Sequence, residues 1–188
     1  TSEVCTHHLW FSDEDYLEKG SKIKWNPAIK SIKDQEALWD GLNKDYIDVL
    51  ATDHAPHTLD EKLAPYLKSP SGGPLVQHSL SALLTSFHKN RISLEKIIEK
   101  ACHNPSILFD IKDRGFIREG FFADLVIIDL EKNYSVKKTN ILYKCGWSPF
   151  ENETFKGIVE KTFVNGHLAY NKGKISTKIA GRALAFKR

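Results

Sequence analysis

The fold of this chain is decided by residues 47–57, whose sequence is IDVLATDHAPH. The first part of this stretch is mostly apolar and favours β structure, which is typical of a buried strand in a parallel sheet. Polar residues follow at once, and Pro56 lacks the backbone N–H that a strand needs. Asp53, His54 and His57 are therefore expected at the carboxyl end of a buried strand. Barrels and open α/β sheets carry their active sites at that end.

A single Asp or His at a strand end is most often a cap or a plain loop residue. Three ionisable side chains within five positions favour a functional interpretation instead. Asp53 is the leading candidate, because a strand-end carboxylate can bind one metal ion and also accept a proton from a water molecule.

Three segments resemble the dihydroorotases, a family of cyclic amidohydrolases. Residues 51–58, ATDHAPHT, resemble the family signature. Residues 3–9, EVCTHHL, resemble a segment that ends in Pro-His-His-Leu, and residues 24–30, KWNPAIK, resemble an Asn-Pro-Pro-Leu-Arg segment. The resemblance continues weakly to about Tyr170. It departs from the family at Thr6, Ala28 and Lys30, and a lysine keeps the charge of arginine but loses its bidentate fork.

The resemblance implies roles for five residues. Asp53 is expected to be a metal ligand and the catalytic proton-transfer residue. Asn26, His57, Ser71 and Gly72 are expected to bind the substrate, His57 through a substrate carboxylate. Taken alone, Asn26 would be read as an ordinary Asn-Pro turn residue.

The other histidines of these motifs receive lesser roles. His54 is expected to point away from the metal and to orient the loop. His7 and His8 follow a strand, but in the family this segment lies beyond the strands that carry metal ligands. An orienting role is the most that the resemblance implies for them.

The implied function is that of a dihydroorotase, which reversibly hydrolyses the cyclic amide of (S)-dihydroorotate to N-carbamoyl-L-aspartate in de novo pyrimidine biosynthesis. Two zinc ions are expected as cofactors and the cytoplasm as the location. A homodimer and a carbamoyltransferase partner are both compatible with the family. Two alternatives stay open: a hydantoinase or allantoinase, and a noncatalytic dihydroorotase-like partner of a carbamoyltransferase. His57 favours the dihydroorotase, because the hydantoin-cleaving relatives usually lack the second His.

Composition excludes several other classes of protein. The 188 residues are 41% hydrophobic and 27% charged, with a net charge of +3, which is ordinary for a globular protein. There is no long run of like charge to bind nucleic acid or an anionic membrane, and no apolar run of transmembrane length. The three cysteines are far apart and form no zinc or disulfide spacing, as expected for a reducing compartment.

The chain has no Met and opens in a strand-like segment, so we expect it to be the C-terminal portion of a longer polypeptide. The remaining family ligands, a His-x-His pair, a carboxylated Lys or Asp and two further His, are expected upstream. The segment alone is therefore expected to be inactive.

Alternating strands and helices predict the C-terminal part of a metal-dependent (β/α)₈ TIM barrel in residues 1–110, followed by a β-rich, sandwich-type segment in residues 111–188. The expected strands are 1–6, 22–25, 47–53 and 123–130, and Asn165-Gly166 predicts a hairpin between 159–164 and 167–170. The expected helices are 13–19, 34–43, 76–88 and 94–102. The long connection 58–74 is expected to form a wall or a lid of the active site.

Overall fold

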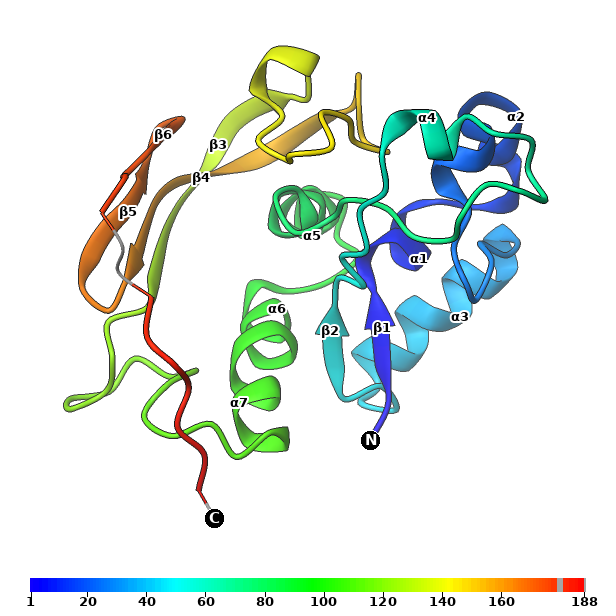
Figure 1. The fold of residues 1–188 in the computed structure, drawn as a ribbon. Helices are drawn as coiled ribbons and strands as arrows, with labels where there is room; N and C mark the ends of the chain where they lie inside the picture. The colour runs from blue at the N-terminus through cyan, green and yellow to red at the C-terminus, as the bar shows by residue number, and fades with distance from the viewer. Residues whose placement is uncertain (179–180, 188) are drawn as a thin grey trace.

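The computed structural model describes residues 1–178 and 181–187. Residues 179–180 and 188, which belong to the expected segment 111–188, lie outside the described residues. Helix α5 (Ser79–His88) runs between a two-stranded parallel sheet and a four-stranded antiparallel sheet (Figure 1). None of the helices in the described ranges is long and apolar enough to cross a membrane.

The parallel sheet pairs β1 (Glu3–Cys5) with β2 (Val49–Ala51), with Cys5 opposite Ala51. This confirms that the strand expected at residues 47–53 belongs to a parallel sheet, and its partner is the strand expected at residues 1–6. Both strands are shorter than expected, because Thr6 already begins α1 (Thr6–Trp10) and pairing with β2 ends there. The chain connecting them crosses over through α3 (Ile32–Asn43), as a parallel pair requires.

Local sequence signals explain the helices around this pair. The Ser31 hydroxyl accepts a hydrogen bond from the Asp34 backbone N–H, so α3 begins two residues before the expected start at 34. The helix expected at 13–19 forms as a 3₁₀ turn, Asp13–Asp15, that continues into α2 (Tyr16–Lys19).

The prediction of a strand at residues 22–25 is wrong. Residues Gly20–Ile23 form a 3₁₀ turn, and no described strand pairs with this segment. The alternating pattern comes from Ile23 and Trp25, which are both buried in a hydrophobic cluster. Packing in the core, and not sheet pairing, therefore produced the alternation.

A short helix, α4 (Leu59–Lys62), follows the motif, and α5 begins at Ser79, three residues later than expected. The delay has a tertiary cause, since the backbone N–H groups of Leu75 and Val76 donate to His54. The helix expected at 94–102 begins as predicted with α6 (Leu94–Ile98). It continues through a π-helical turn, Glu99–His103, into α7 (Asn104–Leu108).

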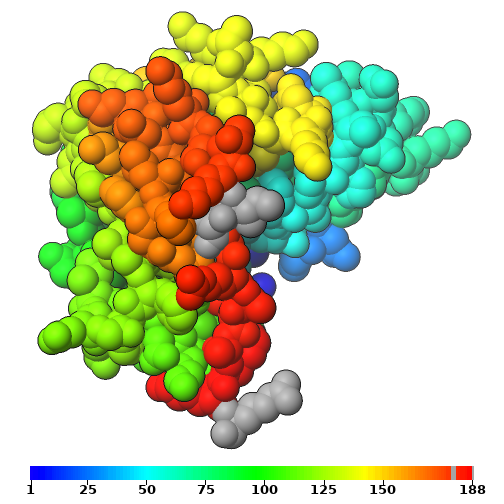
Figure 2. Space-filling model, turned by 60° about the vertical axis from the view of Figure 1, so that its left-hand side comes forward, coloured from blue at the N-terminus to red at the C-terminus, as the bar shows by residue number. Residues whose placement is uncertain are grey.

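The antiparallel sheet has the order β3-β4-β5-β6, made of β3 (Leu125–Ser135), β4 (Thr154–Val164), β5 (His167–Asn171) and β6 (Lys174–Ile175). The predicted hairpin is confirmed, with positive φ at Asn165 and Gly166 between β4 and β5. In Figure 2 the strands β4 to β6, in orange, lie on the visible face. Only this one sheet is found in the described part of residues 111–188. The sandwich and the division at residue 110 therefore stay proposals.

Two buried clusters hold the sheets together. One contains Val4, Leu50 and Leu83 and packs the parallel pair against α5. The other joins Phe11, Trp25 and Leu75 to Phe150, which precedes β4, and to Phe155 in β4. Burial of these apolar side chains is the main favourable contribution to the fold. As a result, α1, which follows β1 directly, is held by both clusters, through Leu9 in the helix and Phe11 just after it.

Candidate active site

Asp53 stands two residues beyond the end of β2. Its backbone has a φ of 45°, which turns the chain sharply out of the strand direction. The side chain is exposed and makes no hydrogen bond or ion pair with any residue in the described ranges. A strand-end carboxylate without a protein partner is suited to a metal ligand or a proton acceptor.

Cys5, the last residue of the neighbouring strand, interacts electrostatically with the Asp53 carboxylate. Burial, with smaller effects from the negative charges of Asp53 and Glu3, raises the pKa of the Cys5 thiol to about 12. The ends of β1 and β2 thus place a buried thiol and an exposed carboxylate in one neighbourhood, as parallel pairing requires.

His54 contacts the segment that leads to α5 through one ring nitrogen. Its Nδ1 accepts hydrogen bonds from the backbone N–H groups of Leu75 at 3.0 Å and Val76 at 3.3 Å. This nitrogen is therefore occupied. The contact fixes the entrance of α5 against the motif.

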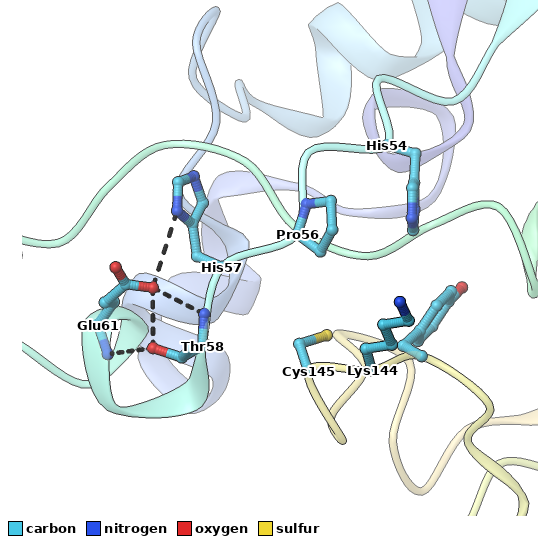
Figure 3. Close-up of a pocket in the computed structure, with 8 residues that line it drawn as sticks. His54, Pro56, His57, Thr58, Glu61, Lys144 and Cys145 are labelled. Carbon is cyan, nitrogen blue, oxygen red and sulfur yellow. Dashed lines mark hydrogen bonds and ion pairs between the residues drawn. The ribbon is translucent and has the colours of Figure 1, made fainter.

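His57 lines an open pocket of about 590 Å³ with the rest of the motif loop and the segment around residue 144. In Figure 3 the ring of His57 stands beside Glu61, across the pocket from Lys144 and Cys145. The His57 Nε2–H donates to the Ser71 carbonyl at 3.0 Å, and its Nδ1 lies 4.0 Å from the Glu61 carboxylate. Because that carboxylate also accepts from the Thr58 backbone N–H, Glu61 both caps α4 and faces the imidazole.

The far wall of this pocket is tied to the motif backbone. The Trp147 indole N–H donates to the His57 carbonyl at 2.8 Å. In Figure 2 the segment near residue 145, in yellow, lies against the cyan segment that contains the motif. Burial raises the pKa of Tyr143 on the same wall, so its phenol stays neutral.

Ser71 and Gly72 lie in a loop that packs directly under the motif. The Ala55 backbone N–H donates to the Gly73 carbonyl at 3.2 Å, and the Gly72 N–H donates to the Lys24 carbonyl at 2.9 Å. Gly72 has a φ of +108°, and a Cβ there would come within 2.7 Å of the Ala55 carbonyl oxygen. Only glycine meets both conditions without strain.

Two lysines hold this loop through backbone carbonyls. The fully buried Lys62 ammonium donates to the carbonyls of Lys24 at 3.2 Å and Pro70 at 2.9 Å. The Lys24 ammonium donates to the carbonyls of Tyr66 and Ser69, both at 2.7 Å. Burial, with a smaller effect from the neighbouring Lys24, lowers the pKa of Lys62 to about 8.

Asn26 is exposed and lies beside the end of β1. The His8 Nε2 is 3.0 Å from the carbonyl oxygen of Pro27, the residue after Asn26. The His7 ring stacks on Trp25, the residue before it, with ring centroids 4.3 Å apart. Burial, with a smaller effect of His8, lowers the pKa of His7 to about 3, so His7 is neutral at pH 7.

The structure thus joins some of the candidate residues and separates others. His57 contacts Ser71 directly, and Gly72 packs against the motif. The neighbour of Asn26, Pro27, contacts His8 instead, and neither Asn26 nor Asp53 lines the pocket that contains His57.

Three further residues escaped the sequence analysis, namely Cys5, Lys62 and Trp147. A Cys two residues before a His-His pair could have indicated a metal site. Lys62 and Trp147 act through tertiary contacts, which no local sequence pattern predicts.

Comparison with known proteins decides the family. The sequence pattern of the Amidohydrolase family matches residues 2–169 of this chain. The chain belongs to the amidohydrolase family. It is 38% identical over 171 residues to a dihydroorotase from Clostridioides difficile strain 630, covering 90% of this chain and 40% of that protein. It is also 37% identical over 174 residues to the Multifunctional protein pyr1-3 of Dictyostelium discoideum, covering 92% of this chain and 7% of that protein.

Solved structures agree with this family. The L-hydantoinase (dihydropyrimidinase) from Arthrobacter aurescens matches with a TM-score of 0.88 and 29% identity, over 94% of this chain and 40% of that one. The inactive dihydroorotase-like domain of a Chaetomium thermophilum CAD-like protein matches with a TM-score of 0.69 and 23% identity, over 96% of this chain and 47% of that one. The chain is thus a mixed α/β part of an amidohydrolase, and it spans less than half the length of these relatives.

Proposed function

We propose that the protein containing this chain is a dihydroorotase, and that this chain supplies its proton-transfer carboxylate and part of its substrate site. The observation that carries the proposal is the run 53–57, with Asp53 free at the carboxyl end of β2 and His57 in the adjoining pocket. The similarity to a curated dihydroorotase over most of the chain supports it.

Amidohydrolases generally depend on metal ions, and we propose two zinc ions here. The donor chemistry of this chain fits one ligand position, because the Asp53 carboxylate is exposed and has no partner among the described residues. Bound zinc supplies a water of lowered pKa and polarises a carbonyl oxygen. The other expected ligands are upstream in the family and are not part of this chain.

Asp53 would take a proton from the attacking water and deliver it to the ring nitrogen that leaves the cyclic amide. Asn26, His57 and the backbone of Ser71 and Gly72 would position dihydroorotate. His57 donates its Nε2–H to the Ser71 carbonyl. A substrate carboxylate would therefore accept a hydrogen bond from a protonated Nδ1, or from Nε2 after the ring has turned away from Ser71.

The first test replaces Asp53 with Asn in the full-length enzyme. Turnover should fall by orders of magnitude, since the amide cannot accept the proton. Kinetics with metal analysis measure this, and near-normal kcat with intact metal content would remove Asp53 from catalysis.

The second test separates His57 from metal binding. His57→Ala should leave bound metal nearly unchanged and lower kcat/KM for dihydroorotate about ten- to a hundredfold, the effect of losing one charge-assisted contact of roughly 1.5–3 kcal/mol. His57→Asn is the matched control, because it retains a neutral donor toward the Ser71 carbonyl but cannot carry a charge. A cyclic amide without the carboxylate should be much less sensitive. Loss of a metal ion, or equal slowing of both substrates, would contradict the role.

A hydantoinase-type activity is the second candidate, favoured by the high TM-score to the Arthrobacter enzyme. It predicts that the substrate without a carboxylate is cleaved at least as well as dihydroorotate. The noncatalytic alternative, which an inactive domain of the same fold illustrates, predicts no turnover of either substrate.

The proposed partners and location rest on the proposed activity and on the similarity to related proteins. A carbamoyltransferase partner is supported by the similarity to a multifunctional protein of Dictyostelium. The homodimer and the cytoplasmic location follow only from the proposed activity.

A further inference from the structure

Three side chains of types that can bind a metal ion lie together where β1 is followed by α1. Cys5 ends the strand, and His7 and His8 lie in the first turn of the helix. One donor atom from each residue lies within 4.8 Å of the other two, and no acidic side chain is needed to complete this group. Thiolate and imidazole together are the ligands that zinc and similar divalent ions prefer.

His7 is the residue that points to a ligand. Its side chain is fully buried, and neither ring nitrogen has a hydrogen-bond partner within residues 1–178 and 181–187. A buried polar group without a partner is costly and rare in folded proteins. Trp25 stacks on the ring and His8 lies tilted against it, but coordination uses the in-plane lone pair of a nitrogen. The stacking therefore fixes the ring and leaves its nitrogens available.

His8 has the arrangement that metal-binding histidines usually show. Its Nε2 is 3.0 Å from the Pro27 carbonyl oxygen, which can only accept, so Nε2 carries the proton. The lone pair is then on Nδ1. A backbone carbonyl that fixes the tautomer in this way orients the ring and strengthens the other nitrogen as a ligand.

We propose that Cys5, His7 and His8 bind one divalent transition-metal ion of the zinc type. This site is additional to the ligand position at Asp53 and gives His7 and His8 more than the orienting role that the sequence implied. Binding forms a sulfur–metal bond and releases the thiol proton to solvent, so Zn²⁺ and Cys–SH give Cys–S–Zn⁺ and H⁺. The carboxylates of Asp53 and Glu3, which both act electrostatically on this thiol, offset the remaining positive charge. The proposal does not depend on which cyclic amide the enzyme cleaves.

The experiment strips the full-length protein with a chelator and reloads it with Co²⁺ alone. A thiolate ligand to Co²⁺ produces an intense near-ultraviolet charge-transfer band, which histidine and carboxylate ligands do not produce. We expect the band in the unaltered protein and its loss in Cys5→Ser. Cys102→Ser and Cys145→Ser are the matched controls, because they remove the other two thiols found in the described part of this chain and should keep the band.

A second variant leaves the thiol in place. His8→Gln can still donate to the Pro27 carbonyl but offers no imidazole nitrogen, and the Co²⁺ affinity measured from the band should fall at least about tenfold. Absence of the band in the unaltered protein, or a band that survives Cys5→Ser, would overturn the proposal. Asp53→Asn should keep the band. Its loss from a folded Asp53→Asn protein would show that Cys5 shares the ion held by Asp53, and would overturn a separate site.

Discussion

Gly72 offers a sharp test of how the loop before α5 is held under the motif. Its φ of +108° is a conformation that residues with a Cβ rarely adopt, and a Cβ would lie 2.7 Å from the Ala55 carbonyl oxygen and 2.9 Å from the Ala55 Cβ. Both contacts are too short to persist, and one of them is with backbone. Gly72→Ala must therefore move either this loop or the motif.

The chain contains a matched control for the backbone contribution. Gly120 also has a positive φ, +82°, but a Cβ there would meet nothing within 4 Å. Gly120→Ala should cost only the conformational strain, roughly 1–2 kcal/mol. Gly72→Ala adds the overpacking of a tight site, about 1–3 kcal/mol more, for a total of roughly 2–5 kcal/mol.

The assay is urea unfolding of the full-length protein followed by circular dichroism, with kcat/KM measured on the same preparations. Gly72→Ala should lower the unfolding free energy more than Gly120→Ala and should also reduce kcat/KM, because Ser71 and His57 move with the loop. Equal destabilisation by the two changes would refute the steric argument. Unchanged kcat/KM in Gly72→Ala would show that this loop does not shape the site.

Two predictions concern pH. The pKa of Lys62 is about 8 in the folded chain and near 10.5 when unfolded, so the folded state binds fewer protons between these values and stability rises with pH across the window. Lys62→Met should therefore lose stability relative to the unaltered protein as pH rises from 8 to 10.5 in parallel urea titrations, and a constant difference would contradict a buried ammonium. Burial lowers the pKa of His78 from 6.5 to about 4. The contribution of the neutral, buried imidazole to folding stability is therefore complete above pH 6.5 and is lost as pH falls toward 4. His78→Leu should flatten this decline in thermal unfolding scans, whereas an unaltered slope would assign the acid sensitivity to other groups.

Much of the fold was predictable from local patterns. The apolar run before Asp53 predicted a parallel strand, and the Asn165-Gly166 pair predicted the hairpin. Ser31 with Asp34 is a further local signal, a helix cap, and it places the start of α3 two residues before the expected one. Each of these signals works through neighbours in the sequence, such as a turn that needs positive φ or a cap that satisfies a free N–H. The strand predicted at residues 22–25 is wrong for a different reason. Alternating apolar residues indicate alternating burial, and side chains can be buried without a partner strand.

The sequence by itself determined which residue types are available for chemistry: a carboxylate and two imidazoles within residues 53–57, and a Cys and two His within residues 5–8. Only the tertiary structure decided how they are used. It bound His54 to the entrance of α5, tied His57 to Ser71, and left Asp53 without a partner among the described residues. It also buried His7 between Trp25 and His8 and set Lys62 under the loop of Gly72. These contacts join segments that are distant in the sequence, and their free energy depends on burial and on hydrogen-bond partners that exist only once the chain has folded.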